Sequence, residues 1–151
     1  MIQNYKPGFI VILLAVFALL HGCAINKATA TVDPTTDLSS LKVFHVKKSA
    51  EDTRDVNVII ENKLEAIGFQ VSETGNDADA IITYVDKWFW DITFYMLELT
   101  ITVRDPKNDF PLASGNSMHS SLSRKSPEKM VDEVLANIFV GKQKQGAKNE
   151  K

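Results

Sequence analysis

The feature that most limits how this chain can fold is an apolar run near its amino terminus. Residues 9–20, FIVILLAVFALL, lack polar side chains and follow a short polar start that contains Lys6. As a helix, this run spans roughly 18 Å at about 1.5 Å per residue, which is short of the ~30 Å hydrocarbon core of a membrane. A charged start followed by a short apolar run is typical of a secretory signal peptide. We therefore assign residues 1–22 to a signal peptide, with a transmembrane anchor as the alternative.

The only cysteine of the chain follows this run, within the sequence Leu20-His21-Gly22-Cys23. These four residues resemble the lipobox of bacterial lipoproteins. The resemblance implies that Cys23 carries a diacylglycerol, that residues 1–22 are removed, and that the new amino terminus is acylated, commonly with palmitate. Several acyl chains anchor a protein stably, because each buried methylene contributes about 0.8 kcal/mol. A secreted protein with an incidental cysteine is the alternative.

The residues after the cysteine bear on the destination within the cell envelope. Ala24 and Ile25 stand where enteric-type bacteria place an aspartate that retains a lipoprotein in the inner membrane. By this resemblance, we expect the protein on the periplasmic face of the outer membrane, with the inner membrane as the alternative.

The rest of the chain is predicted to contain a tether, one domain and a tail. Residues 23–40 are rich in Thr, Ala, Ser and Asp and keep no period of 2 or 3.6, which predicts a flexible tether on the lipidated cysteine. Val32 and Leu38 permit the alternative that part of this segment packs on the domain. Residues 41–140 are predicted to form the domain, and the lysine-rich residues 141–151 a disordered tail.

Hydrophobic periodicity within the domain predicts two helices and about five strands. The helices are expected from Ser49 to Gly68 and from Ser126 to Gly141, because apolar residues recur at helical spacing between a capping serine and a terminating glycine. Strands are expected at residues 41–46, 69–72, 80–89, 95–103 and 112–122. The order β-α-β-β-β-β-α predicts an α+β two-layer sandwich, with a mostly antiparallel sheet and two helices on one face.

Two details of this sheet are predicted from side-chain character. In residues 95–103 the alternation directs Tyr95, Leu97 and Leu99 to one face and Met96 to the other. The core face of residues 80–89 is ambiguous. The strand at residues 112–122 is polar, which predicts a position near an edge of the sheet.

The most distinctive segment runs from Tyr84 to Met96 and contains a Trp-Asp pair followed by Tyr-Met. It resembles a hairpin in small proteobacterial envelope lipoproteins of unassigned function. The sequences Ala113-Ser114-Gly115 and Ser126-Pro127-Glu128-Lys129 are similar to that family too. The order of elements also resembles the anticodon-binding-like sandwich of several envelope lipoproteins, including the plug of the lipopolysaccharide translocon and activators of cell-wall synthases. A resemblance of fold does not assign a function.

Aromatic side chains occupy both faces of this predicted hairpin, so some rings must lie outside the core that the helices cover. Such a surface is typical of a contact with a protein or a lipid, and we expect an envelope protein as the partner. The predicted contact residues are Trp88, Phe89, Trp90, Asp91, Phe94 and Tyr95. Alternatively, the rings close the end of the core and Asp91 caps the turn.

No set of residues in the sequence predicts catalysis, a metal site or a cofactor. The segment from Gly115 to His119 lacks the second glycine of a nucleophile elbow. His45 has no partner at ligand spacing, and a single cysteine excludes a multi-cysteine zinc site. The 17 basic and 19 acidic residues nearly balance, so we expect no nucleic-acid partner.

The sequence therefore predicts a non-enzymatic binding or accessory subunit of an envelope assembly. One alternative is a small periplasmic hydrolase that uses His119 and a nearby carboxylate. The candidate carboxylates are Asp79, Asp86, Asp91 and Glu98. Another alternative is a carrier that holds a lipid or amphiphile between the sheet and the helices.

Overall fold

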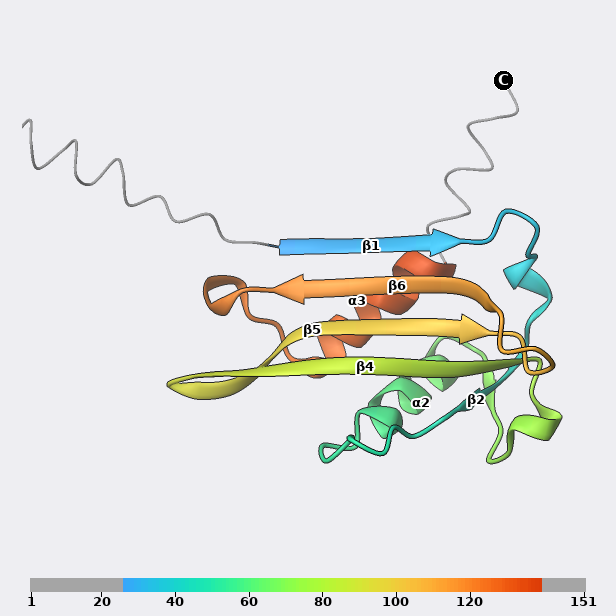
Figure 1. Ribbon diagram of the computed structural model, residues 1–151, viewed down its shortest axis with the longest axis horizontal. Coiled ribbons are helices and arrows are strands. Elements are labelled where there is room, and N and C mark those ends of the chain that lie inside the picture. Colours follow the sequence, from blue (N-terminus) through green and yellow to red (C-terminus); the bar gives the residue numbers. More distant parts are fainter. Residues whose placement is uncertain (1–25, 140–151) are drawn as a thin grey trace, which may run out of the picture.

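The computed structural model describes residues 26–139, so the predicted signal peptide, Cys23 and the tail lie outside the described residues. Within this range two helices accompany one six-stranded sheet (Figure 1). The strands are β1 (Asn26–Val32), β2 (Val43–Val46), β3 (Gln70–Val71), β4 (Ala80–Asp91), β5 (Thr93–Arg104) and β6 (Pro111–His119). The helices are α2 (Val56–Ala66) and α3 (Pro127–Phe139).

The strands follow the order β1-β6-β5-β4-β2-β3. The first four strands in this order, β1, β6, β5 and β4, pair antiparallel with their neighbours. Strand β2 is parallel to both of its neighbours, β4 and β3. The α+β class is therefore confirmed, but the sheet is mixed and has six strands rather than about five.

The additional strand is β1, which lies in the segment predicted to be a flexible tether. All seven of its residues pair with β6, from Asn26 opposite His119 to Val32 opposite Ala113. The tether prediction is therefore wrong for β1, and Leu38 in the following turn is also buried. An edge strand is held mainly by backbone hydrogen bonds, so its small side chains need not alternate in polarity. Because β1 pairs with it, β6 is the second strand of the sheet, which is near an edge as predicted but is not the edge strand.

Helix α2 begins later than predicted, since residues 50–54 form turns and bends. The Asp52 carboxylate accepts hydrogen bonds from the backbone N–H groups of Arg54 (2.9 Å) and Asn57 (3.1 Å) and from the Tyr84 hydroxyl (2.6 Å). Burial acts to raise the pKa of Asp52, but these hydrogen bonds outweigh it and lower the pKa to about 2. Asp52 thus satisfies the start of α2 from a loop and ties it to β4.

The two predicted helix ends that depend on special residues are confirmed. Gly68 has a φ of 96°, the left-handed conformation that ends a helix at little cost to glycine. At the start of α3, Pro127 is the first helical residue, and the Ser126 hydroxyl accepts a hydrogen bond from the Lys129 N–H at 3.4 Å.

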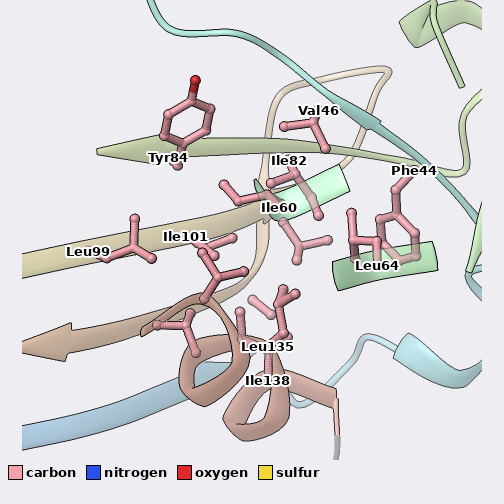
Figure 2. Packing of buried hydrophobic residues seen from close by; sticks show 14 of the residues in the cluster. Phe44, Val46, Ile60, Leu64, Ile82, Tyr84, Leu99, Ile101, Leu135 and Ile138 are labelled. Atoms are coloured by element: carbon pink, nitrogen blue, oxygen red, sulfur yellow. The ribbon is translucent and has the colours of Figure 1, made fainter. Parts of the chain in front are cut away.

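Both helices pack on the same face of the sheet and form one hydrophobic core with it (Figure 2). Residues of α2, α3 and three different strands contribute fully buried side chains to this core, among them Phe44, Ile60, Leu64, Ile82, Leu99, Ile101, Leu135 and Ile138. Helix α3 lies close to β6 at Gly115, where a Cβ atom would lie 2.8 Å from Cγ1 of Val134. The two layers are therefore in direct contact along α3, where the carrier hypothesis needs space for a ligand.

The pairing of β4 with β5 contains one irregularity that reverses the predicted face of Met96 near the start of β5, whereas Leu99 faces the core as predicted. Lys87 lies opposite Glu98, whereas Trp88 lies opposite Met96, so Leu97 is the extra residue of a β-bulge. Met96 therefore faces the core and is 1% exposed, which corrects its predicted orientation. Residues 95–97 are all apolar, so the sequence pattern fits either register.

Candidate functional site

The end of the β4–β5 hairpin, residues 88–96, extends beyond the strands that flank it in the sheet, and we call it the aromatic hairpin. The pairing of β5 with β6 begins only at Glu98, and that of β4 with β2 ends at Ile82. Two pairs of rings lie directly opposite each other, Phe89 with Tyr95 and Trp90 with Phe94. Since side chains alternate along a strand, these two pairs occupy opposite faces of the hairpin. Both faces are therefore aromatic, as the sequence predicts.

Most of the large side chains of the aromatic hairpin are in contact with solvent. The exposed fractions are 52% for Phe89, 61% for Trp90 and 63% for Phe94. Ile92, at the tip, is 85% exposed and has a φ of 65°. A β-branched residue is rare in this left-handed region, and Ile92 therefore costs the fold some stability.

Two of the predicted contact residues are covered by other parts of the chain. Tyr95 is 8% exposed, because the Arg124 guanidinium lies 4.3 Å from the centroid of its ring. Trp88 is half-buried: its indole N–H donates to the Asp86 carboxylate at 2.6 Å, and Arg54 lies 4.4 Å from its ring. The accessible part of the predicted contact site therefore excludes Tyr95 and includes Ile92, which the sequence analysis did not select.

Asp91 joins the aromatic hairpin to the turn η3 (Ser121–Ser123) that follows β6. Its carboxylate accepts hydrogen bonds from the Ser121 hydroxyl and from the Arg124 guanidinium, the latter at 3.2 Å. Arg124 also donates to the Thr93 hydroxyl at 2.8 Å and to the Asp91 carbonyl at 3.1 Å. Asp91 and Arg124 thus tie the turn of the hairpin to η3, and the Asp91 side chain is bound within the chain rather than presented to a partner.

A second group of polar residues lies between β6 and α3 and contains the histidine considered for catalysis. The Glu133 carboxylate accepts hydrogen bonds from the Ser117 hydroxyl (2.7 Å) and from Lys125 (2.8 Å), and His119 Nε2 lies 2.8 Å from it. Burial acts to raise the pKa of Glu133, but the hydrogen bonds from His119, Lys125 and Ser117 outweigh it and lower the pKa to about 2. An ionised carboxylate only accepts, so His119 Nε2 carries a proton and donates it.

The geometry of this group is structural rather than catalytic. Ser117 donates to Glu133 and not to His119, whereas a triad needs the histidine to accept the proton of the serine. Ser117 and His119 are both 0% exposed, so neither reaches a substrate from solvent. The group therefore ties β6 to α3 through a polar network inside the core.

Sequence reasoning missed Glu133 as the partner of His119. The signal that could have found it is the pair of polar residues, Ser117 and His119, at alternate positions of an otherwise apolar strand face. Buried polar groups need hydrogen-bonding partners, so a polar residue on the facing helix is expected. Glu133 provides this partner from the side of the apolar stripe of α3, where it is half-buried.

The four carboxylates considered for catalysis have separate partners and do not form a pair. Asp79 accepts the backbone N–H groups of residues 42 and 43, and Asp86 accepts from Trp88. Glu98 forms an ion pair with Lys87 at 2.7 Å, and Asp91 binds Arg124 as described above. Within residues 26–139, no group of three or more His, Cys, Asp and Glu side chains is placed to hold a metal ion.

The described part of the chain has two clefts at the end opposite the aromatic hairpin. They have volumes of ≈ 390 Å³ and ≈ 420 Å³, and both are lined in part by Phe69 and Phe139. Neither brings together the candidate catalytic residues. Among residues 26–139, no helix is both long enough and apolar enough to span a membrane.

Comparison with known proteins supports the fold. No protein-family model and no curated protein matches the sequence. The solved structure of the PelC dodecamer from Paraburkholderia phytofirmans matches with a TM-score of 0.54 and 14% identity, over 76% of this chain and 98% of that chain. At this identity the likeness shows a shared fold alone.

Two weaker structural likenesses are too distant to carry an argument. A DUF4136 family protein from Bacteroides thetaiotaomicron has a TM-score of 0.47 and 9% identity, over 81% of this chain and 95% of that chain. A minor lipoprotein from Acinetobacter baumannii has a TM-score of 0.31 and 20% identity, over 73% of this chain and 90% of that chain.

Proposed function

We propose that this protein is a lipid-anchored lipoprotein on the periplasmic face of the outer membrane, acting as a non-enzymatic binding or accessory subunit of an envelope assembly. The observation that carries the proposal is the position of the folded domain along the chain. Strand β1 begins at Asn26, three residues after Cys23, so the domain lies directly beside its predicted point of lipid attachment. A domain placed in this way works at a membrane surface rather than at a distance from it.

Two features of the domain favour binding over catalysis. The hydrolase hypothesis depends on His119, whose partner Glu133 holds it in a buried network that also includes Ser117. By contrast, the exposed apolar side chains of the aromatic hairpin present a large surface to another molecule. The residues available to solvent are thus suited to contact.

The anchor is tested by comparing the wild-type protein with a Cys23→Ser variant in fractionated envelopes. We expect the wild type to sediment with the outer membrane and to carry diacylglycerol and an N-acyl group on Cys23 by intact mass. We expect the Cys23→Ser variant to be released into the soluble periplasmic fraction. Wild-type protein that is unmodified at Cys23 would refute lipidation, and sedimentation with the inner membrane would correct the destination.

The binding role is tested by photocrosslinking in intact envelopes. A photoreactive residue is placed at Thr100, on the sheet face that the helices leave open, and in parallel at Phe94 in the aromatic hairpin. A reproducible protein adduct at either position supports a binding role. A second copy of this chain is one candidate partner, since PelC, which shares the fold, was solved as a dodecamer.

The hydrolase alternative is tested with the variants Ser117→Ala and His119→Gln in a strain that lacks the wild-type gene. We expect both variants to restore the phenotype to the extent that they restore the amount of folded protein. Loss of the phenotype at a normal level of folded protein would support catalysis and overturn the proposal.

A further inference from the structure

The aromatic hairpin and the first residue of β1, Asn26, lie at the same end of the sheet. Strand β1 is antiparallel to β6, and β6 is antiparallel to β5, so β1 and β5 run in the same direction. Both strands therefore start at the same end of the sheet. Figure 1 shows this end on the left, where the turn that joins β4 to β5 lies below the start of β1 and extends farther to the left.

The strand register shows how far the hairpin tip and Cys23 can each extend from the same level of the sheet. Asn26 lies opposite His119. The preceding residue of β6, Met118, lies opposite Glu98 of β5, so His119 and Asn26 are level with Leu97, the residue before Glu98. From that level, the five residues to the tip at Ile92 extend roughly 15 Å at about 3.3 Å per residue. The three residues from Asn26 back to Cys23 reach up to roughly 10 Å. A lipid on Cys23 therefore brings the membrane surface within reach of the hairpin tip.

The exposed side chains at this end are those that favour a membrane interface. Trp90, Ile92 and Phe94 are more than half exposed, and so is Leu122, in the turn η3 that follows β6 at the same end. Aromatic rings with flanking cations are typical of the boundary between headgroups and acyl chains. Here Arg54 lies 5.4 Å from the ring of Phe94.

We propose that the tip of the aromatic hairpin inserts into the membrane interface beside the lipid on Cys23. This inference rests on the proposed lipid anchor and adds a second, shallow contact. An acyl anchor alone leaves the domain free to rotate about its attachment point. With the hairpin inserted as well, the clefts beside Phe69 and Phe139 face away from the membrane, because they lie at the opposite end of the domain.

A membrane is favoured over a protein partner for this surface because the anchor, if present, supplies a membrane at this end of the molecule. A protein partner would have to compete with that membrane for side chains which stand only roughly 15 Å beyond the first residue of β1. Binding of a protein at the hairpin is therefore the alternative outcome that the crosslinking experiment below distinguishes.

The two tryptophans of the chain provide a direct probe, because both Trp88 and Trp90 lie in the aromatic hairpin. The full-length lipidated protein is reconstituted into vesicles of phosphatidylethanolamine and phosphatidylglycerol, with or without bromine on the acyl chains. We expect brominated lipid to quench roughly half of the tryptophan fluorescence, since interfacial insertion immerses the exposed Trp90 more than the half-buried Trp88.

The variant Ile92→Asp places a charge at the tip, where the side chain is 85% exposed and its replacement leaves the core intact. We expect it to abolish most of the quenching while the protein stays on the vesicles through its lipid. The matched control is Phe110→Asp, an exposed aromatic residue just before β6 at the opposite end of the sheet, where Arg104 lies opposite Pro111. This variant should be quenched like the wild type.

The results separate the inference from the proposed function. If the protein is lipidated and bound to the vesicles but brominated lipid does not quench its tryptophans, the inference is overturned and the anchor is not affected. If intact mass finds no lipid on Cys23, the proposed anchor fails, and quenching of the unlipidated protein on the same vesicles then decides the inference alone. In envelopes, a photoreactive residue at Phe94 should give lipid adducts. A protein adduct there would assign the hairpin to a protein partner instead.

Discussion

The β6–α3 interface and the aromatic hairpin belong to the same sheet but use their side chains in opposite ways. At the interface, the polar residues Ser117 and His119 face inward, and the Ser117 hydroxyl and His119 Nε2 are hydrogen-bonded to Glu133. At the aromatic hairpin, apolar residues such as Trp90 and Phe94 face outward and stay exposed. From side-chain type alone, the polar residues would be expected at the surface and the apolar residues in the core. The contrast indicates that the interface holds the fold together, whereas the exposed apolar side chains of the hairpin contribute little to stability and are available for contact.

The largest effect is expected from removing the carboxylate at the centre of the interface. The variant Glu133→Ala leaves Ser117, His119 and Lys125 without their shared acceptor, and we expect a loss of about 3 kcal/mol in the free energy of unfolding. Urea denaturation measures this loss. The matched control is Asp132→Ala, on the same helix as Glu133. It removes an exposed ion pair with Lys63 of α2 and should cost less than about 0.5 kcal/mol. Equal effects of the two variants would contradict the structural role of the network.

A pH titration tests the same network and the loop that begins α2. The pKa values of Asp52 and Glu133 are both lowered to about 2 in the folded protein. Their stabilisation is therefore fully present above the ordinary pKa of each group and is lost as the pH falls toward 2. We expect each group to account for about 2 to 3 kcal/mol of the unfolding free energy lost between about pH 5 and pH 2.

The pH titration is monitored by urea denaturation at each pH. In Glu133→Gln, a smaller loss of stability on acidification than in the wild type is expected, since one of the two titrating groups is absent. An unchanged pH profile in this variant would exclude Glu133 as a source of the effect.

A single methyl group at the interface is expected to have the next largest effect. In Gly115→Ala, the added carbon would lie 2.8 Å from Val134 Cγ1 and 3.0 Å from Ile138 Cγ1, so α3 must shift. We expect a loss of about 2 kcal/mol by urea denaturation, in the range for overpacked cores. In Gly75→Ala the closest atom would be Ile81 Cδ1 at 3.4 Å, and this control should be close to neutral.

The smallest effect, and the only favourable one, is expected at the hairpin tip. In Ile92→Asn, a residue that tolerates the left-handed conformation replaces a β-branched one, and we expect a gain of about 0.5 to 1 kcal/mol in the free energy of unfolding. The control is Val85→Asn, an exposed residue within β4, which should bring no gain. A clear loss of stability in Ile92→Asn would show that the tip is part of the fold and would remove the contrast between the two regions.

The sequence predicted those helices and strands whose residue pattern lies within the helix or strand itself. The apolar stripe of α3 is buried as expected, and Gly68 adopts the conformation expected of a helix terminator. The aromatic faces of the hairpin followed from the period of two in a strand. Tyr95 was assigned correctly to the hairpin, but its burial by Arg124 depends on a residue from a distant turn and could not be predicted from the strand alone.

The features that escaped prediction depend on pairing across the chain. Strand β1 consists of small residues that lack an alternating pattern and become ordered by hydrogen bonding to β6. The bulge at Leu97 could not be located, because the neighbouring residues are apolar in both registers. The partner of His119 lies on a helix that only the packing of α3 brings into contact with β6.

The sequence by itself determined the α+β class, the amphipathic faces of both helices and the aromatic character of the hairpin, because each of these is set by neighbouring residues. It also supplied the expectation of a lipid on Cys23. Only the tertiary structure decided that His119 is enclosed with Glu133 and that β1 starts at the end where the hairpin protrudes. Both outcomes follow from contacts between segments far apart in the chain, and no local pattern of residues encodes which distant segment becomes the neighbour.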